Sequence, residues 1–481
     1  MTTVIVGAGF AGIAAAIALA RRGIDDVVIL ERADAVGGTW RDNTYPGVAC
    51  DVPSHLYGLE THPWPAWSRA FAPGDEIRAY LEHVVRTEGL EDRLRLGTAL
   101  TGARWDGGAW RVRTSADEEL VADHLILACG RLTDPKIPSI PGLESFPGPL
   151  FHSARWRHDV PVAGRRVAVA GTGASAVQLV PELVRRGAEV VLLQRTPAWI
   201  VPRGDRPHTE AEIAHWRDDP AALRALRDEL YTEGEARFAS RSGDPIAAAE
   251  ARALAQAHLE AQVPDPRLRA ALTPDYAFGC RRVLLSDDFY PAIASGAARL
   301  VPSALAEVDG DTLVAADGTR HEADVLVLAT GFEAARQPYA RLVTGEHGTT
   351  LDAHWSGGYT AAASTLVPGF PNLFVLGGPN AALGHNSAVL ILEAQAAFAA
   401  ELVAAGRPIR VTPEQEARST AEVDALAAGT PWLTGGCHSW YVDERSGRLT
   451  LLWPGTVAAF RERLDRLKNA LIPVTADQGA S

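Results

Sequence analysis

The chain opens with an alternation of short apolar runs and a long helical pattern. An apolar run at 4–6 precedes a glycine-rich turn, a helical segment at 11–23 and a second apolar run at 27–31. The turn has the spacing GxGxxG, formed by Gly7, Gly9 and Gly12. This order predicts a Rossmann-like βαβ unit, whose turn approaches a pyrophosphate at the helix N-terminus. Glu31 ends the second strand, where a carboxylate accepts hydrogen bonds from ribose hydroxyls.

A second unit of the same kind begins at Arg166. An apolar strand, the turn GTGASA and a helical segment lead to another apolar strand at 189–194. The turn glycines are Gly171 and Gly173. The strand ends in Gln194 and Arg195, so no carboxylate stands at the ribose position. An Arg there is typical of a 2′-phosphate site, which predicts NADP(H) rather than NAD; the alternative is a solvated charge at a strand end.

Two units that differ at the ribose position indicate an enzyme that passes a hydride from NADPH to a flavin, with FAD in the first unit. Apolar runs at 125–128 and 324–328, each followed by a small residue and Gly, predict strands that lead into the linkers between domains. Pro-rich 134–142 predicts a stiff crossover. We therefore expect an α/β protein with two Rossmann-like domains, arranged as FAD-binding 1–145, NADPH-binding 146–335 with a helical insertion at about 204–272 over the active-site cleft, and FAD-binding 336–481.

Composition narrows the class of protein further. A chain of 481 residues with 47% hydrophobic and 22% charged residues is typical of a multi-domain globular enzyme. The net charge of -13, without a basic block, argues against nucleic acid or anionic membranes as partners. Four scattered cysteines show no CxxC pair, metal site or compact disulfide framework, and no leader or anchor opens the chain, so a reducing cytoplasm is expected. No obligate protein partner is evident, and the last residues, TADQGAS, are expected to be disordered.

The stretch FPGPLFHSARW at 146–156 fits neither one helical face nor one strand face. Its fixed positions are Phe146, Gly148, His152 and Trp156. This stretch resembles the fingerprint FxGxxxHxxxW of the type I Baeyer-Villiger monooxygenases, relatives of the flavin-containing monooxygenases. Further matching stretches cover nearly the whole chain: GGTW, YPGVACD, GCRR, ATGF, GHNS and CHSWY. Arg157 departs from the Pro or Asp that usually follows the fingerprint, while Trp156 favours the ketone-oxygenating branch.

The resemblance implies an FAD-dependent enzyme that uses NADPH and O2 to insert one oxygen atom beside a ketone carbonyl. The product is an ester or lactone, formed through a C4a-peroxyflavin and a tetrahedral Criegee adduct. Arg282 in GCRR matches the active-site Arg that stabilises both anions, Asp51 matches the carboxylate that pairs with it, and His152 is implied to position the linkers rather than to transfer protons.

The same resemblance implies two sets of cofactor-binding residues. For FAD these are Gly7, Gly9, Gly12, Glu31, Thr39, Trp40, Arg41, Asp42, Asp51, Tyr57 and Leu100. For NADP(H) they are Gly171, Thr172, Gly173, Ser175, Gln178, Arg195, Thr196, Arg281, Arg282 and Trp440. Trp440 fits the nicotinamide side or the interior of the protein equally well.

Three alternative functions stay open at this point. An N- or S-oxygenating flavin-containing monooxygenase needs no strong partner for a peroxide anion, so Arg282 argues against it. A disulfide reductase needs a redox-active cysteine pair beside the flavin, and Cys50 has no close companion in sequence. A flavin-binding sensor would lack turnover, and Arg282 would then be an interface residue. The particular ketone, the regioselectivity and the oligomeric state do not follow from the sequence.

Overall fold

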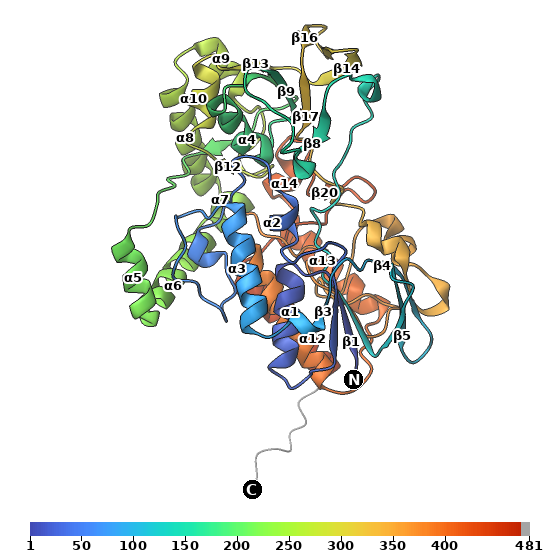
Figure 1. The fold of residues 1–481 in the computed structure, drawn as a ribbon. Helices are drawn as coiled ribbons and strands as arrows, with labels where there is room; N and C mark the ends of the chain where they lie inside the picture. The colour runs from blue at the N-terminus through green and yellow to red at the C-terminus, as the bar shows by residue number, and fades with distance from the viewer. Residues whose placement is uncertain (473–481) are drawn as a thin grey trace.

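The computed structural model describes residues 1–472, so the expected disorder of TADQGAS lies outside the described residues. Its framework is two five-stranded parallel sheets (Figure 1). The first has the order β19-β7-β1-β2-β3, with β1 (Thr3–Val6), β2 (Val27–Leu30), β3 (Leu94–Arg95), β7 (His124–Leu127) and β19 (Leu373–Val375). The second has the order β13-β10-β9-β17-β8, with β8 (Leu150–His152), β9 (Arg166–Ala170), β10 (Glu189–Leu193), β13 (Ala298–Val301) and β17 (Val325–Leu328). Both βαβ units predicted from the sequence are therefore present.

The first sheet and its helices form the lower half of the molecule in Figure 1. Helix α1 (Phe10–Ala20) is rich in alanine and buried over most of its length, because it lies between the sheet and α12 (Ala388–Ala404). The remaining helices of this half are α2 (Thr39–Asp42), α3 (Gly74–Thr87), α11 (Leu351–His354), α13 (Pro413–Ala427) and α15 (Val457–Leu471). A smaller sheet of β4 (Leu100–Trp105), β5 (Trp110–Thr114), β6 (Glu119–Ala122) and β18 (Val343–Thr344) packs beside it.

The second sheet forms the upper half, with α4 (Ala174–Arg185) and α10 (Phe289–Ala294) against it. An antiparallel sheet extends this half, made of β14 (Leu305–Asp309), β15 (Thr312–Ala315) and β16 (Arg320–Glu322). The chain crosses between the halves twice. The two linkers run side by side, because the Lys136 N–H donates to the Gly331 carbonyl at 2.8 Å and the Glu333 N–H donates to the Asp134 carbonyl at 2.9 Å. The Pro-rich segment thus lies against the segment around Gly331 that leads back to the first half, and together they form a double linker.

The helical insertion lies between two short paired strands, β11 (Ile200–Val201) and β12 (Leu284–Leu285). Its helices are α5 (Glu210–Asp218), α6 (Pro220–Ala236), α7 (Phe238–Ser242), α8 (Pro245–Gln262) and α9 (Pro266–Leu272). Three of them begin at an Asp-Pro pair, in which the Asp side chain caps the first turn and the Pro occupies the first helical position.

The insertion spans both halves of the molecule. Glu235 on α6 accepts hydrogen bonds from Asn386 at 2.9 Å and from the Val457 N–H at 3.0 Å, and it contacts His385 at 3.3 Å. In Figure 1, α5 and α6 extend from the upper half down beside the helices of the first sheet. The insertion therefore contacts both halves; that it covers the active-site cleft stays a prediction.

The spacing of the cysteines did not indicate a disulfide, but the structure contains one. Cys280 and Cys437 form a disulfide across a sequence separation of 157 residues. The Ala277 N–H also donates to the Gly435 carbonyl at 2.9 Å, which ties the GCRR segment to the loop between α14 (Pro431–Thr434) and β20 (Val442–Asp443). Strand β20 pairs with β21 (Arg448–Leu449). Within residues 1–472, no helix has the length and apolar character needed to span a membrane.

Candidate active site

The first glycine turn contains two glycines that the fold requires and one that it does not. A Cβ on Gly7 would lie 2.4 Å from the Ala128 carbonyl oxygen, and one on Gly12 would lie 1.8 Å from the Gly7 carbonyl oxygen. Gly9, with φ of -89°, would make only an ordinary 3.6 Å contact with Gly38. No side-chain hydrogen bond caps α1 at Gly9, so no side chain satisfies its first N–H groups. This end of the helix fits a pyrophosphate.

The second glycine turn likewise contains one glycine that the fold requires and one that it does not. Gly171 has φ of +112°, and its Cβ would lie 2.5 Å from the Ala329 carbonyl oxygen. Gly173 has φ of -79° and no heavy atom within 4 Å of a Cβ, so the protein's own packing does not require glycine there. Gly173 also begins α4 without a side-chain cap, whereas Asp219 and Asp244 cap helices of the insertion. Ser175 lies in the first turn of α4. The uncapped helix and the missing side chain fit a second pyrophosphate.

Glu31 lies at the carboxyl end of β2, as predicted, and is buried. Its carboxylate accepts hydrogen bonds from the Ala8 N–H at 2.9 Å and the Ala33 N–H at 3.0 Å. Arg41 forms an ion pair with Glu31 at 2.9 Å and with Asp42 at 2.7 Å. These contacts hold the Glu31 carboxylate beside the first glycine turn, where it could accept hydrogen bonds from a ribose.

Arg195 and Arg281 lie near each other at the end of β10. Within the described part of the chain, neither forms an ion pair with a carboxylate closer than 4 Å. The Arg281 guanidinium lies 5.4 Å from the Tyr276 ring centroid; burial lowers the pKa of Arg281, and the charge of Arg195 lowers it further. The Thr172 hydroxyl donates to the Thr196 carbonyl at 2.9 Å, which holds this strand end against the glycine turn. Two uncompensated cations fit a phosphate.

Helix α4 also joins the two halves. The Gln178 amide donates to the Ala49 carbonyl at 2.9 Å and accepts from the Tyr45 hydroxyl at 2.9 Å. Gly47 lies so close to α4 that a Cβ would come within 2.8 Å of the Gln178 carbonyl oxygen. Gln178 thus anchors the YPGVACD loop, a contact that its sequence position did not predict.

The predicted pair of Arg282 and Asp51 forms across 231 residues of sequence. Arg282 Nε donates to Asp51 Oδ2 at 2.8 Å, and Nη2 forms an ion pair with the same oxygen at 2.6 Å. The Asp51 carboxylate raises the pKa of Arg282, and the two side chains remain 31% and 28% exposed. Asp51 belongs to the half that contains the first glycine turn and Arg282 to the half that contains the second, so the ion pair joins the two halves. The geometry fixes one permanent positive charge between them.

The fingerprint residues lie where the linkers meet the second sheet. Gly148 passes so close to the neighbouring strand that a Cβ would be 2.3 Å from the Asp324 carbonyl oxygen. Phe146 is buried, and Trp156 packs edge-on against Phe151 at 5.1 Å. His152 Nδ1 accepts from the Ala154 N–H at 3.1 Å, and burial lowers the pKa of His152 to about 4. A neutral, buried imidazole beside the linker fits positioning better than proton transfer.

The structure also places the remaining residues predicted to bind FAD and the nicotinamide side. Trp40 and Tyr57 are packed edge-on at 5.5 Å, and Thr39 precedes them at the start of α2. Leu100 is buried at the start of β4, in the apolar core of the smaller sheet. Trp440 is 42% exposed, which excludes the reading of this side chain as an interior aromatic.

Several residues around the site were not among the residues predicted to form it. Arg203 donates to the Cys50 carbonyl at 3.0 Å and stacks on Phe71 at 5.2 Å. Tyr441 has a buried hydroxyl that lies close to Arg282. Arg241 of α7 lies on the same side. Tyr441 belongs to the matching stretch CHSWY, but no motif links it to Arg203 or Arg241, because the fold brings the three together from separate segments.

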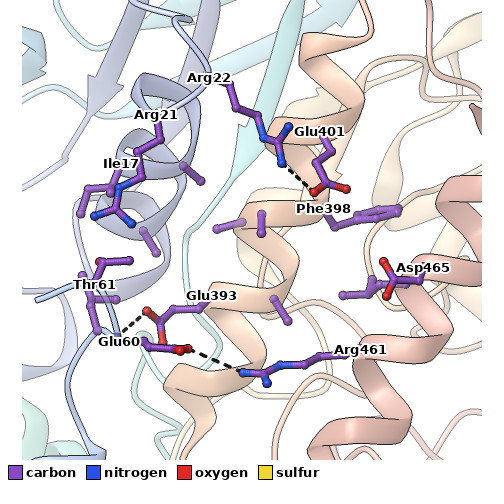
Figure 2. A pocket seen from close by; sticks show the side chains of 17 residues that line it. Ile17, Arg21, Arg22, Glu60, Thr61, Glu393, Phe398, Glu401, Arg461 and Asp465 are labelled. Atoms are coloured by element: carbon purple, nitrogen blue, oxygen red, sulfur yellow. Dashed lines mark hydrogen bonds and ion pairs between the residues drawn. The ribbon is translucent and has the colours of Figure 1, made fainter. Parts of the chain in front are cut away.

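A cavity of about 420 Å³ lies elsewhere, between α1, α12 and α15 (Figure 2). Ile17 and Phe398 contribute apolar surface, and Arg22 pairs with Glu401 at 2.6 Å beside them. None of the residues that line this cavity is a candidate site residue. We assign the chemistry to the space around Arg282.

Two nucleotide turns, one with an acidic and one with a basic ribose position, define a flavin- and pyridine nucleotide-dependent oxidoreductase. Residues 4–219 match the family model described as pyridine nucleotide-disulphide oxidoreductase. A Baeyer-Villiger monooxygenase of Streptomyces coelicolor is 45% identical over 99% of this chain and 94% of its own length. A Baeyer-Villiger monooxygenase of Pseudomonas aeruginosa is 38% identical over 95% of this chain and 88% of its own length.

Solved structures agree with these relatives. An oxidised steroid monooxygenase bound to NADP has a TM-score of 0.85 at 30% identity, covering 98% of both chains. Cyclohexanone monooxygenase from Rhodococcus sp. Phi1 bound to NADP+ has a TM-score of 0.86 at 28% identity, covering 97% of both. The chain belongs to the Baeyer-Villiger monooxygenase family.

Proposed function

We propose that this protein inserts one oxygen atom from O2 beside the carbonyl of a small-molecule ketone and gives an ester or lactone. Ketone, O2, NADPH and a proton are consumed, and ester, water and NADP+ are released. FAD and NADPH are the cofactors: FAD, reduced by NADPH, supplies the activation of oxygen when it is bound. Family membership and the two glycine turns support this assignment.

The observation that carries the proposal is the ion pair of Arg282 and Asp51, which joins the halves that contain the two glycine turns. A guanidinium cannot lose its proton during turnover, and the carboxylate fixes its orientation. Arg282 would therefore stabilise the negative charge that develops on the former carbonyl oxygen. An N- or S-oxygenating enzyme needs no such charge, which is why the ketone reaction is preferred.

The remaining site residues bind and orient. We assign Gly7, Gly9 and Gly12 with Glu31 to FAD, and Gly171 to Gln178 with Arg195, Thr196 and Arg281 to NADP(H). His152 holds the linkers. A disulfide reductase would need a reactive pair at Cys50, but Cys50 is a buried free thiol whose pKa is raised by that burial.

The domain limits follow the crossings of the chain. We propose FAD-binding segments at 1–145 and 336–481 and an NADPH-binding segment at 146–335. A cytoplasmic location also stays a prediction; it was based on cysteine usage, and the disulfide of Cys280 and Cys437 weighs against that basis.

The test is a panel of linear, cyclic and aromatic ketones incubated with the FAD-loaded enzyme, NADPH and ¹⁸O2. We expect at least one product that gains a single ¹⁸O atom, with NADPH consumed in equal amount. NADPH oxidation that only makes hydrogen peroxide with every ketone, together with oxygenation of amines or sulfides, would reject the proposal.

A further inference from the structure

Arg241 is a cation without an ion-pair partner among residues 1–472. It lies on α7, and its guanidinium stacks on the Phe278 ring at 4.6 Å from the centroid. Nε and Nη1 are both buried and make no hydrogen bond, and residues 1–472 provide no carboxylate within ion-pair distance. Burial lowers the pKa of Arg241 to about 10, so the side chain remains charged at neutral pH.

The position of Arg241 places it beside the candidate active site. Gly279 lies against it, since a Cβ there would be 3.5 Å from the Arg241 Cα and Cδ atoms. Arg282 lowers the pKa of Arg241 through its positive charge, and Tyr441 is close enough to affect both guanidinium groups. Asp51 compensates Arg282 but makes no contact with Arg241. Asp51 therefore compensates the charge of Arg282 and leaves that of Arg241 without an ion pair in the described residues.

A buried guanidinium with unused donors is unfavourable unless an anion completes it. We propose that Arg241 binds the carboxylate of the substrate, so that this enzyme prefers keto acids in which the ketone faces Arg282 and the acid faces Arg241. This inference rests on the proposed function. The phosphates of NADP(H) already have Arg195, Arg281 and the N-terminus of α4, which makes the substrate the better source of the anion.

The experiment compares acid and ester forms of the same ketone. The substrates are oxo acids from 4-oxopentanoate to 8-oxononanoate and their methyl esters, tested with the FAD-loaded enzyme and NADPH. Arg241→Met keeps the length and stacking surface of the side chain but removes the charge. The control is Arg237→Met, which removes an exposed cation that pairs with Glu233 at 3.4 Å.

We expect the parent enzyme to prefer at least one acid over its ester. Arg241→Met should lower the acid-to-ester ratio of kcat/KM about 10- to 100-fold, the size of one charged hydrogen-bonded contact, while Arg237→Met keeps the ratio of the parent. An unchanged ratio in Arg241→Met overturns the inference. A rise in the KM for NADPH as large as the loss on the acid also overturns it, because the anion would then belong to the cofactor.

A binding measurement separates this inference from the proposed function. Hexanoate, which has no ketone, is titrated into the FAD-loaded enzyme by calorimetry. Binding to the parent that weakens at least tenfold in Arg241→Met supports the anion site even if no ketone is oxygenated. Equal binding by both proteins, or none by the parent, contradicts it whatever the outcome of the ketone panel.

Discussion

Replacing Gly173 by alanine should separate cofactor binding from folding. The residue has φ of -79° and ψ of -172°, which alanine adopts, and no heavy atom lies within 4 Å of the added methyl group. Replacing glycine by alanine reduces the conformational freedom of the unfolded chain, which stabilises the folded protein by about 0.4–1 kcal/mol. Alanine is also a poorer N-cap than glycine, and this costs a similar amount of stability. We expect the free energy of unfolding to change by less than about 1 kcal/mol.

The same methyl group should obstruct NADPH. It would stand at the uncapped N-terminus of α4, where the pyrophosphate has to approach the backbone N–H groups. Overpacking at a close contact costs about 1–3 kcal/mol, which corresponds to a rise of about 5- to 150-fold in the dissociation constant for NADPH.

The assay combines thermal unfolding with a titration of NADPH monitored by the rate of flavin reduction. Gly171→Ala is the matched control, because its Cβ would lie 2.5 Å from the Ala329 carbonyl oxygen and φ is +112°. This control should lose stability. If Gly173→Ala binds NADPH as tightly as the parent, Gly173 does not have to be glycine to admit the pyrophosphate. If it unfolds as readily as Gly171→Ala, Gly173 is needed for folding. Either result would refute the prediction.

Three further predictions address other parts of the protein. Arg195→Ala should raise the KM for NADPH with little effect on NADH, because only NADPH carries the 2′-phosphate; equal losses would count against that role. Cys437→Ser should lower stability by about 2–4 kcal/mol, since the disulfide closes a loop of 157 residues; a reductant should lower the Tm of the parent but not of the variant, and equal sensitivity would contradict this. Burial raises the pKa of Glu393 to about 7, so the parent should lose stability as pH rises from about 4.5 through 7. Glu393→Gln should therefore be about 2–3 kcal/mol more stable than the parent at pH 8 and equal at pH 5; a difference independent of pH would exclude this.

Local patterns predicted both nucleotide units. The strand, glycine turn and helix at Gly7 and at Gly171 are short-range features, and the backbone geometry that they need is set within about twenty residues. The helical insertion could also be predicted, because helix-forming residues at helical spacing are a local signal.

Contacts between distant segments could not be predicted from spacing. The resemblance alone suggested that Asp51 meets Arg282, and no motif marked the Cys280–Cys437 disulfide or the unpaired Arg241. Each depends on how the two halves and the insertion pack together. Sequence periodicity describes single helices and strands, so it carries no information on these contacts.

The most direct test of the account is a single-turnover measurement on Arg282→Ala. The FAD-loaded variant is first reduced with NADPH and then mixed with O2 and a ketone that the parent converts. We expect reduction to proceed and ester formation to fall at least 100-fold, because the lost charge stabilises the transition state by about 3 kcal/mol or more. Ester formed by the variant at the rate of the parent would contradict the role of Arg282 and the account that depends on it.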